Sequence, residues 1–91
     1  VVVVADHHPD AETVVVDTTT RYVYLGRLAA ATETALVLEA ADVHDLEDGA
    51  SSREIYVLQS RHDGVRENRR EVTIARPLVV SVSRLDDVIP Y

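Results

Sequence analysis

Two groups of residues have the side chains needed to bind a metal ion. In the first, His7 and His8 lie between Asp6 and Asp10, and imidazole and carboxylate groups are common zinc ligands. Pro9 keeps His8 extended, and adjacent side chains of an extended segment point to opposite sides. One site that uses both histidines is therefore awkward, and we expect a solvated loop without metal.

The second group surrounds His44, which lies among the carboxylates Asp42, Asp45, Glu47 and Asp48. The charge suits a divalent cation, but the segment lacks the regular oxygen-ligand spacing and the interior glycine of an EF-hand loop. We again expect a solvated acidic loop, over residues 44–49, and no metal.

Signatures of catalysis are missing from the sequence. It contains no Gly-x-Ser-x-Gly, no glycine-rich phosphate loop and no His-Glu-x-x-His. Ser81 and Ser83 share one face of a predicted strand, where a hydroxyl pair needs no role, and Asp86 and Asp87 are neighbours in a tail. Cysteine is absent, which excludes disulfides and thiolate metal sites. We expect no enzymatic activity, no cofactor and no small-molecule substrate.

The charge is unevenly distributed along the chain. Sixteen acidic residues and nine arginines give a formal charge of −7, which argues against non-specific binding to nucleic acids or acidic membranes. Residues 61–76 are the exception, with five arginines and three acids. With Tyr22, Tyr24 or Tyr56 available for stacking, this segment suits a local nucleic-acid patch. Interleaved arginine and glutamate also suit salt bridges within the domain or between copies, and we favour pairing between copies over RNA contact.

The elements that position these residues begin with a pair of strands around a glycine. Hydrophobic alternation predicts strands at residues 13–16 and 22–31, a turn at 32–34 and a further strand at 35–43. Gly26 lies inside the second strand, where a glycine is costly unless the strand bends sharply or another backbone comes close. A small, strongly curved β-barrel has that need.

A helix is predicted at about residues 52–62, within an insert that spans 47–70. Ser51 and Glu54 have the spacing of a capping box, and Gly64 lies where a helix terminator is expected. The alternative is a strand over the same residues, and we favour the helix.

The last part of the chain returns to strands. After a charged connector at 65–70, we expect a short strand at 71–75, a last strand at 78–83 and a tail at 85–91. Pro77 cannot donate to a strand ladder, which fits a boundary between the two strands. Because the last strand is apolar on both sides, it suits pairing with a neighbouring copy.

These residues resemble the Sm/LSm family, the small RNA-associated barrels that include bacterial Hfq. The family's first motif is a strand, a basic residue, an aromatic residue two before a glycine, a leucine two after it, a turn and an apolar strand. The matching residues are 14–17, Arg21, Tyr24, Gly26, Leu28 and 36–38. The second motif is a short strand, Arg-Gly and a β-branched strand, to which residues 72–82 are similar. The resemblance spans residues 13–84, interrupted by the insert.

The chain departs from the family at two places. The family's base-binding turn has an Asp and an Asn that contact the base, whereas this chain has Thr32, Glu33 and Thr34, and Glu33 would repel phosphate. The family's Arg-Gly is Arg76-Pro77 here, which keeps a candidate phosphate or base contact. The RNA site implied by the resemblance consists of Arg76, Thr32, Glu33, Thr34 and Tyr24.

We therefore expect one mostly β domain over residues 1–91: a small five-stranded SH3-like (Sm-like) barrel with one short helix inserted between strands 3 and 4, and a loose segment at 1–11. A domain of this size has a marginal core, which favours association. The resemblance implies a homo-oligomeric ring that binds RNA; the alternative is a non-catalytic assembly module without RNA binding. The implied oligomer interface consists of Ile74, Leu78, Val79, Val80 and Val82. Since no apolar run reaches the roughly 18 residues of a membrane span, we expect a cytoplasmic protein that does not bind membranes.

Overall fold

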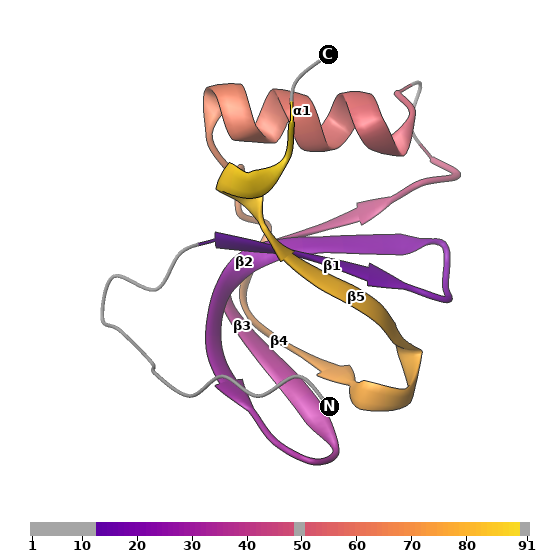
Figure 1. The fold of residues 1–91 in the computed structure, drawn as a ribbon, viewed down its shortest axis with the longest axis vertical. Helices are drawn as coiled ribbons and strands as arrows, with labels where there is room; N and C mark the ends of the chain where they lie inside the picture. The colour runs from indigo at the N-terminus through magenta and orange to yellow at the C-terminus, as the bar shows by residue number, and fades with distance from the viewer. Residues whose placement is uncertain (1–12, 49–50, 90–91) are drawn as a thin grey trace.

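A computed structural model describes residues 13–48 and 51–89 of the chain. These residues form one five-stranded antiparallel sheet in the order β4-β3-β2-β1-β5, with the helix α1 inserted between β3 and β4 (Figure 1). The strands are β1 (Thr13–Thr18), β2 (Tyr22–Ala31), β3 (Ala35–Asp45), β4 (Arg69–Ala75) and β5 (Val79–Arg84). The helix is α1 (Arg53–Asp63), and the short 3-10 helices are η1 (Arg76–Leu78) and η2 (Leu85–Asp87). The predicted mostly β chain with five strands and one inserted helix is confirmed.

The sheet is strongly curved but not closed. β4 pairs with β3 and β5 pairs with β1, and these two strands end the strand order on opposite sides. The closed barrel that we expected from the sequence is therefore not formed by the hydrogen bonding within this sheet. Within the described part of the chain, each of the two strands has one side without a strand partner.

The bend of the sheet centres on Gly26 of β2. Across this position β3 has one residue more than β2, and Ala40 in that bulge takes a φ of 49°. A Cβ atom on Gly26 would lie 3.1 Å from both Cα and Cβ of Ala41, closer than most real Cβ contacts. The glycine is needed because the bulged strand approaches it closely, as its place inside a strand predicted.

Two apolar clusters occupy the two faces of the sheet. β1 shows the alternation, since Val14 and Val16 belong to one cluster and Val15 to the other. The first cluster, formed by the sheet curling on itself, consists of Val14, Val16, Leu28, Leu36, Leu38, Ala41 and Ile74. The second cluster, which lies beneath α1 and η2, consists of Val15, Val23, Leu25, Val57 and Leu85.

The helix begins and ends at the signals expected from the sequence, with one correction. Its N-cap is Ser52, whose hydroxyl accepts the N–H of Ile55 at 3.3 Å, so the expected capping box from Ser51 to Glu54 is not the cap. Gly64 ends the helix with a φ of 89° and donates its N–H to the carbonyl of Ser60. No helix in the described part of the chain has the length and apolar character needed to span a membrane.

Three segments differ from the sequence-based expectation. β3 continues through Asp45, so the start of the predicted acidic loop is strand. β4 already begins at Arg69, within the predicted connector, because Arg69 pairs with Ala41 of β3. In the predicted tail, Leu85 is buried beneath the helix. The predicted N-terminal loose segment and its histidines lie outside the described residues.

Candidate functional site

The turn between β2 and β3 lies next to η1, as the RNA-site prediction requires. Arg76 Nε donates to the carbonyl oxygen of Thr32 at 2.8 Å, and the Arg76 backbone N–H donates to that of Thr34 at 2.9 Å. The hydroxyl of Thr32 accepts the N–H of Ala35 at 3.1 Å, and Glu33 is exposed. Four of the five residues predicted to bind RNA are thus neighbours, with the arginine bonded to the turn itself.

The fifth residue, Tyr24, lies in the middle of β2, where it pairs with Val16 and Val43. It packs half-buried against the first apolar cluster, and this burial, with a smaller effect of Tyr22, raises its pKa. Tyr24 therefore contributes to the core and does not belong to the turn.

His44, expected in a solvated loop, is instead covered by the helix. The ring of Tyr56 stacks on it with 3.8 Å between ring centroids and 8° between planes. The Tyr56 hydroxyl donates to Asp42 at 2.5 Å, and burial, followed by that carboxylate, raises the pKa of Tyr56 far above its ordinary value. The buried Nε2 of His44 has no hydrogen-bond partner among the described residues.

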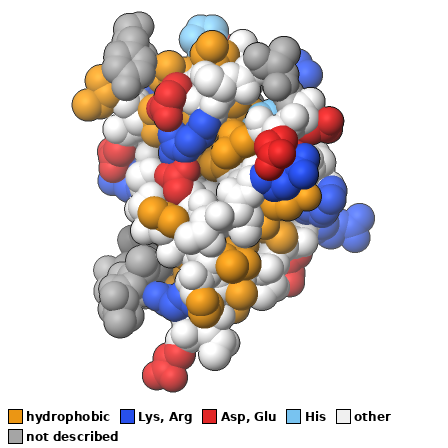
Figure 2. Space-filling model, turned by 90° about the vertical axis from the view of Figure 1, so that its right-hand side faces the viewer, with side chains coloured by type: hydrophobic (Ala, Val, Ile, Leu, Met, Phe, Trp, Pro, Cys, Tyr) orange, Lys and Arg blue, Asp and Glu red, His pale blue; other side chains and the backbone are white. Residues whose placement is uncertain are grey.

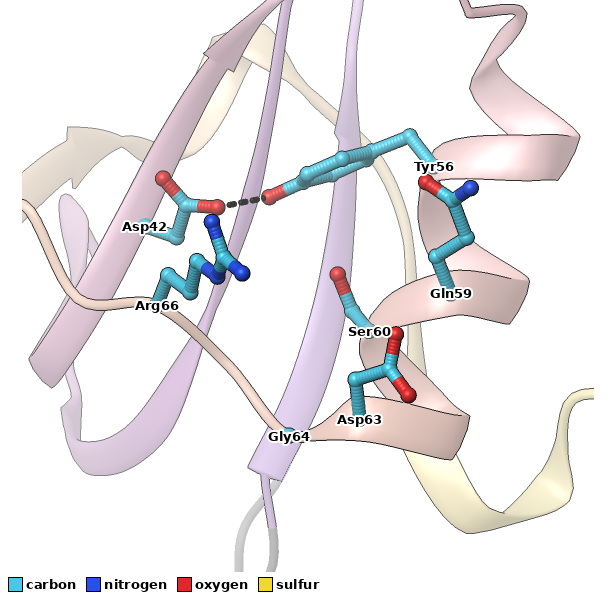
Figure 3. A pocket seen from close by; sticks show the side chains of 7 residues that line it. All are labelled: Asp42, Tyr56, Gln59, Ser60, Asp63, Gly64 and Arg66. Atoms are coloured by element: carbon cyan, nitrogen blue, oxygen red, sulfur yellow. Dashed lines mark hydrogen bonds between the residues drawn. The ribbon is translucent and has the colours of Figure 1, made fainter.

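A pocket of about 330 Å³ opens beside this arrangement, between α1 and β3 (Figure 3). Most of its lining residues have polar side chains, and they come from three places: β3, α1 and the segment that follows. The lining residues are Asp42, Tyr56, Gln59, Ser60, Asp63, Gly64 and Arg66. Figure 3 shows the carboxylate of Asp42, the hydroxyl of Tyr56 and the guanidinium of Arg66 turned toward one another. Sequence reasoning missed this pocket.

Three arginines that precede residue 61 each have a carboxylate partner. Arg21 pairs with Asp45 at 2.7 Å and Arg27 with Glu39 at 3.4 Å. The first of these pairs lowers the pKa of Asp45 through its hydrogen bond with the guanidinium.

The third pair joins the helix to the sheet. Arg53 holds both oxygens of Asp17, with Nε–Oδ1 at 2.6 Å and Nη2–Oδ2 at 2.7 Å. Ser81 of β5 donates a further hydrogen bond to the same carboxylate at 3.0 Å. This group ties the start of α1 to β1 and β5, and the hydrogen bond to Asp17 raises the pKa of Arg53.

The arginines from the last turn of α1 to the start of β4 are different. Arg61, Arg66, Arg69 and Arg70 are all exposed, and none forms an ion pair with a carboxylate of the described residues. The described residues thus hold no ion pair for these four arginines, and the pairing between copies that we favoured for this segment stays a prediction. We call these four residues the unpaired arginines.

The residues predicted for an oligomer interface are divided between surface and core. Val80 is 64% exposed and Leu78 is 38% exposed, while Ile74 is only 2% exposed and packs in the first cluster. Val79 and Val82 are half-buried against that cluster. Exposed apolar side chains (orange) are visible over the lower half of the side shown in Figure 2.

Of the two groups considered as metal ligands, the one with His7 and His8 lies outside the described residues. In the described chain, no three His, Asp or Glu side chains are placed so that they could hold a metal ion together. Comparison of the chain with protein-family models, with curated proteins and with solved structures found no match.

Proposed function

We propose that this chain is an Sm-like, homo-oligomeric assembly module in which the β4 edge of one copy pairs with the β5 edge of the next. The observation that supports it is the open sheet, whose order leaves one side of β4 and one side of β5 without a strand partner among residues 13–48 and 51–89. Unpaired backbone N–H and C=O groups of this kind are a template for another strand. Pairing two different edges is a head-to-tail contact, which generates a ring when the rotation closes.

The side chains of β5 support the same proposal. Natural edge strands are usually protected by charge or proline, but the β5 edge exposes Val80 to 64%. β4 is charged at its start and contributes its backbone, since Ile74 is already buried. The bend of β2 at Gly26 and the five-strand order support an Sm-like curvature of each copy.

Light scattering tests the assembly. The wild-type protein should have a mass of several times 10.1 kDa, and Val80→Asp should reduce the mass to the 10.1 kDa of one copy. The control is Ile55→Asp, which places the same charge on a 50% exposed apolar residue of α1 and should leave the mass unchanged. A monomeric wild-type protein, or an unchanged mass for Val80→Asp, contradicts the proposal.

RNA binding is a second candidate function, favoured by the unpaired arginines. Four guanidinium groups within residues 61–70 without carboxylate partners among the described residues are free to contact phosphates. The formal charge of −7 opposes them, so we expect modest affinity that falls steeply with salt. Fluorescence anisotropy of short RNAs at low and high salt tests this. Absence of binding up to about 100 μM at low salt would exclude RNA and leave an assembly module alone.

A further inference from the structure

The pocket between α1 and β3 and the unpaired arginines beside it together have the features of a nucleotide site. Two carboxylates, from Asp42 and Asp63, line the pocket together with the guanidinium of Arg66. Its volume of about 330 Å³ lies at the lower end of the range of pockets that bind small ligands, roughly 300 to 1,000 Å³. The ligand must therefore be small and must satisfy both signs of charge.

The carboxylates determine what the inner part of a ligand must supply. Asp42 is held in place because its Oδ2 accepts the hydroxyl of Tyr56, and that ring is fixed in turn by its stacking on His44. An ionised carboxylate only accepts hydrogen bonds. A group that enters the pocket next to Asp42 must consequently donate N–H or O–H bonds.

The arginines determine which chemical groups the ligand must have outside the pocket. Arg66 lines the pocket, and Arg69 pairs with Ala41, the residue before Asp42. Arg61 directly follows Ser60 of the pocket wall. Guanidinium groups bind phosphate and also stack on the faces of nucleobases. Successive arginines along one segment suit the repeated phosphates of a strand better than a single acidic group on a peptide.

We propose that this pocket takes one base of a single-stranded RNA, with Asp42 accepting a hydrogen bond from the base and the unpaired arginines contacting the backbone. The site prefers a base with an exocyclic amino group over uracil, because adenine, cytosine and guanine offer N–H₂ donors where uracil offers only carbonyl oxygens and one ring N–H. This inference rests on the RNA binding proposed above and places it outside the turn at 32–34. It is independent of the assembly through β4 and β5.

The test compares labelled oligo(A), oligo(C) and oligo(U) of equal length by fluorescence anisotropy at low salt. We expect the adenine and cytosine strands to bind at least about tenfold more tightly than the uracil strand, since one well-formed base contact discriminates by that order. Asp42→Asn, which still accepts the Tyr56 hydroxyl but also presents donors, should bring the three affinities together. Arg66→Ala should weaken all three equally. Asp45→Asn, a β3 carboxylate paired with Arg21, is the matched control and should keep the preference.

Each other outcome overturns a defined part of the inference. Equal affinity of the wild-type protein for the three strands, or a preference that survives Asp42→Asn, excludes the base pocket while RNA binding stands. No binding of any strand excludes RNA binding and the pocket with it, and binding of a phosphorylated peptide instead would assign the arginines to a protein partner. Thermal unfolding of Asp42→Asn and Arg66→Ala checks that both variants remain folded.

Discussion

Two regions of the molecule differ in whether their side chains have partners within the chain. One is the side of the sheet beneath α1, and the other is the surface of the remaining segments. Beneath the helix, Arg53 pairs with Asp17 and Tyr56 with Asp42, around an apolar cluster that includes Val57. Elsewhere, Val80 of β5 is exposed, and the unpaired arginines, which lie on the last turn of α1, the segment after it and β4, have no carboxylate partner among the described residues. Groups of the first kind stabilise the fold, and our proposals assign groups of the second kind to contacts with other molecules.

The largest difference should appear when the same substitution is made in both regions. Val57 is 1% exposed and Val80 is 64% exposed. Val57→Asp buries a carboxylate without a partner and should cost several kcal/mol, on the order of 3 to 5, enough to unfold a small domain. Val80→Asp should change the unfolding free energy of the single copy by less than about 0.5 kcal/mol. Urea unfolding at low protein concentration measures both, and equal losses would remove the distinction.

Replacing arginines in the two regions should give a smaller difference in unfolding free energy. Arg53→Ala leaves Asp17 without its two charge-assisted bonds; because the side chains are 32% and 23% exposed, we expect a loss of only about 1 to 2 kcal/mol. Arg70→Ala should be neutral within about 0.5 kcal/mol and should instead weaken RNA binding. A destabilisation by Arg70→Ala as large as that by Arg53→Ala would show that this arginine has a structural partner after all.

Replacement of Tyr56 should have the smallest effect on stability, and this effect should depend on pH. The pKa of Tyr56 is raised above the ordinary value of 10.0, chiefly by burial, so the unfolded chain ionises first. Its contribution to stability is fully present below pH 10 and is lost as the pH rises above it. Tyr56→Phe cannot ionise and should reduce the alkaline loss, although Tyr24, whose pKa is also raised, keeps part of it. Unfolding midpoints from about pH 8 to about pH 11 check this, with Tyr22→Phe as control.

The parts of the fold that the sequence predicted are those set by local chemistry. Gly26 predicted a close backbone contact because only a residue without Cβ fits there, and Gly64 predicted the end of α1 because few other residues accept its φ of 89°. The strand at residues 22–31 follows directly from alternation. Each of these signals needs only neighbours in the chain.

The candidate site was missed because its contacts join distant segments. Nothing near Asp42 and His44 in the sequence shows that Tyr56 covers them, since the helix reaches them only after folding. The one available signal was that both side chains fall on the same face of a strand that we ended two residues too early. The unpaired arginines lack carboxylate partners within the described residues for a related reason, because charges that alternate along the chain need not face one another in space.

Amide hydrogen exchange of β4 and β5 tests the proposed assembly most directly. We predict that in the wild-type protein the amides of both edge strands exchange slowly. Val80→Asp should accelerate the exchange of these amides, while the amides in the centre of β2 and β3 stay protected. Equal exchange of β4 and β5 in the wild-type protein and in Val80→Asp would contradict edge pairing and, with it, the proposed oligomer.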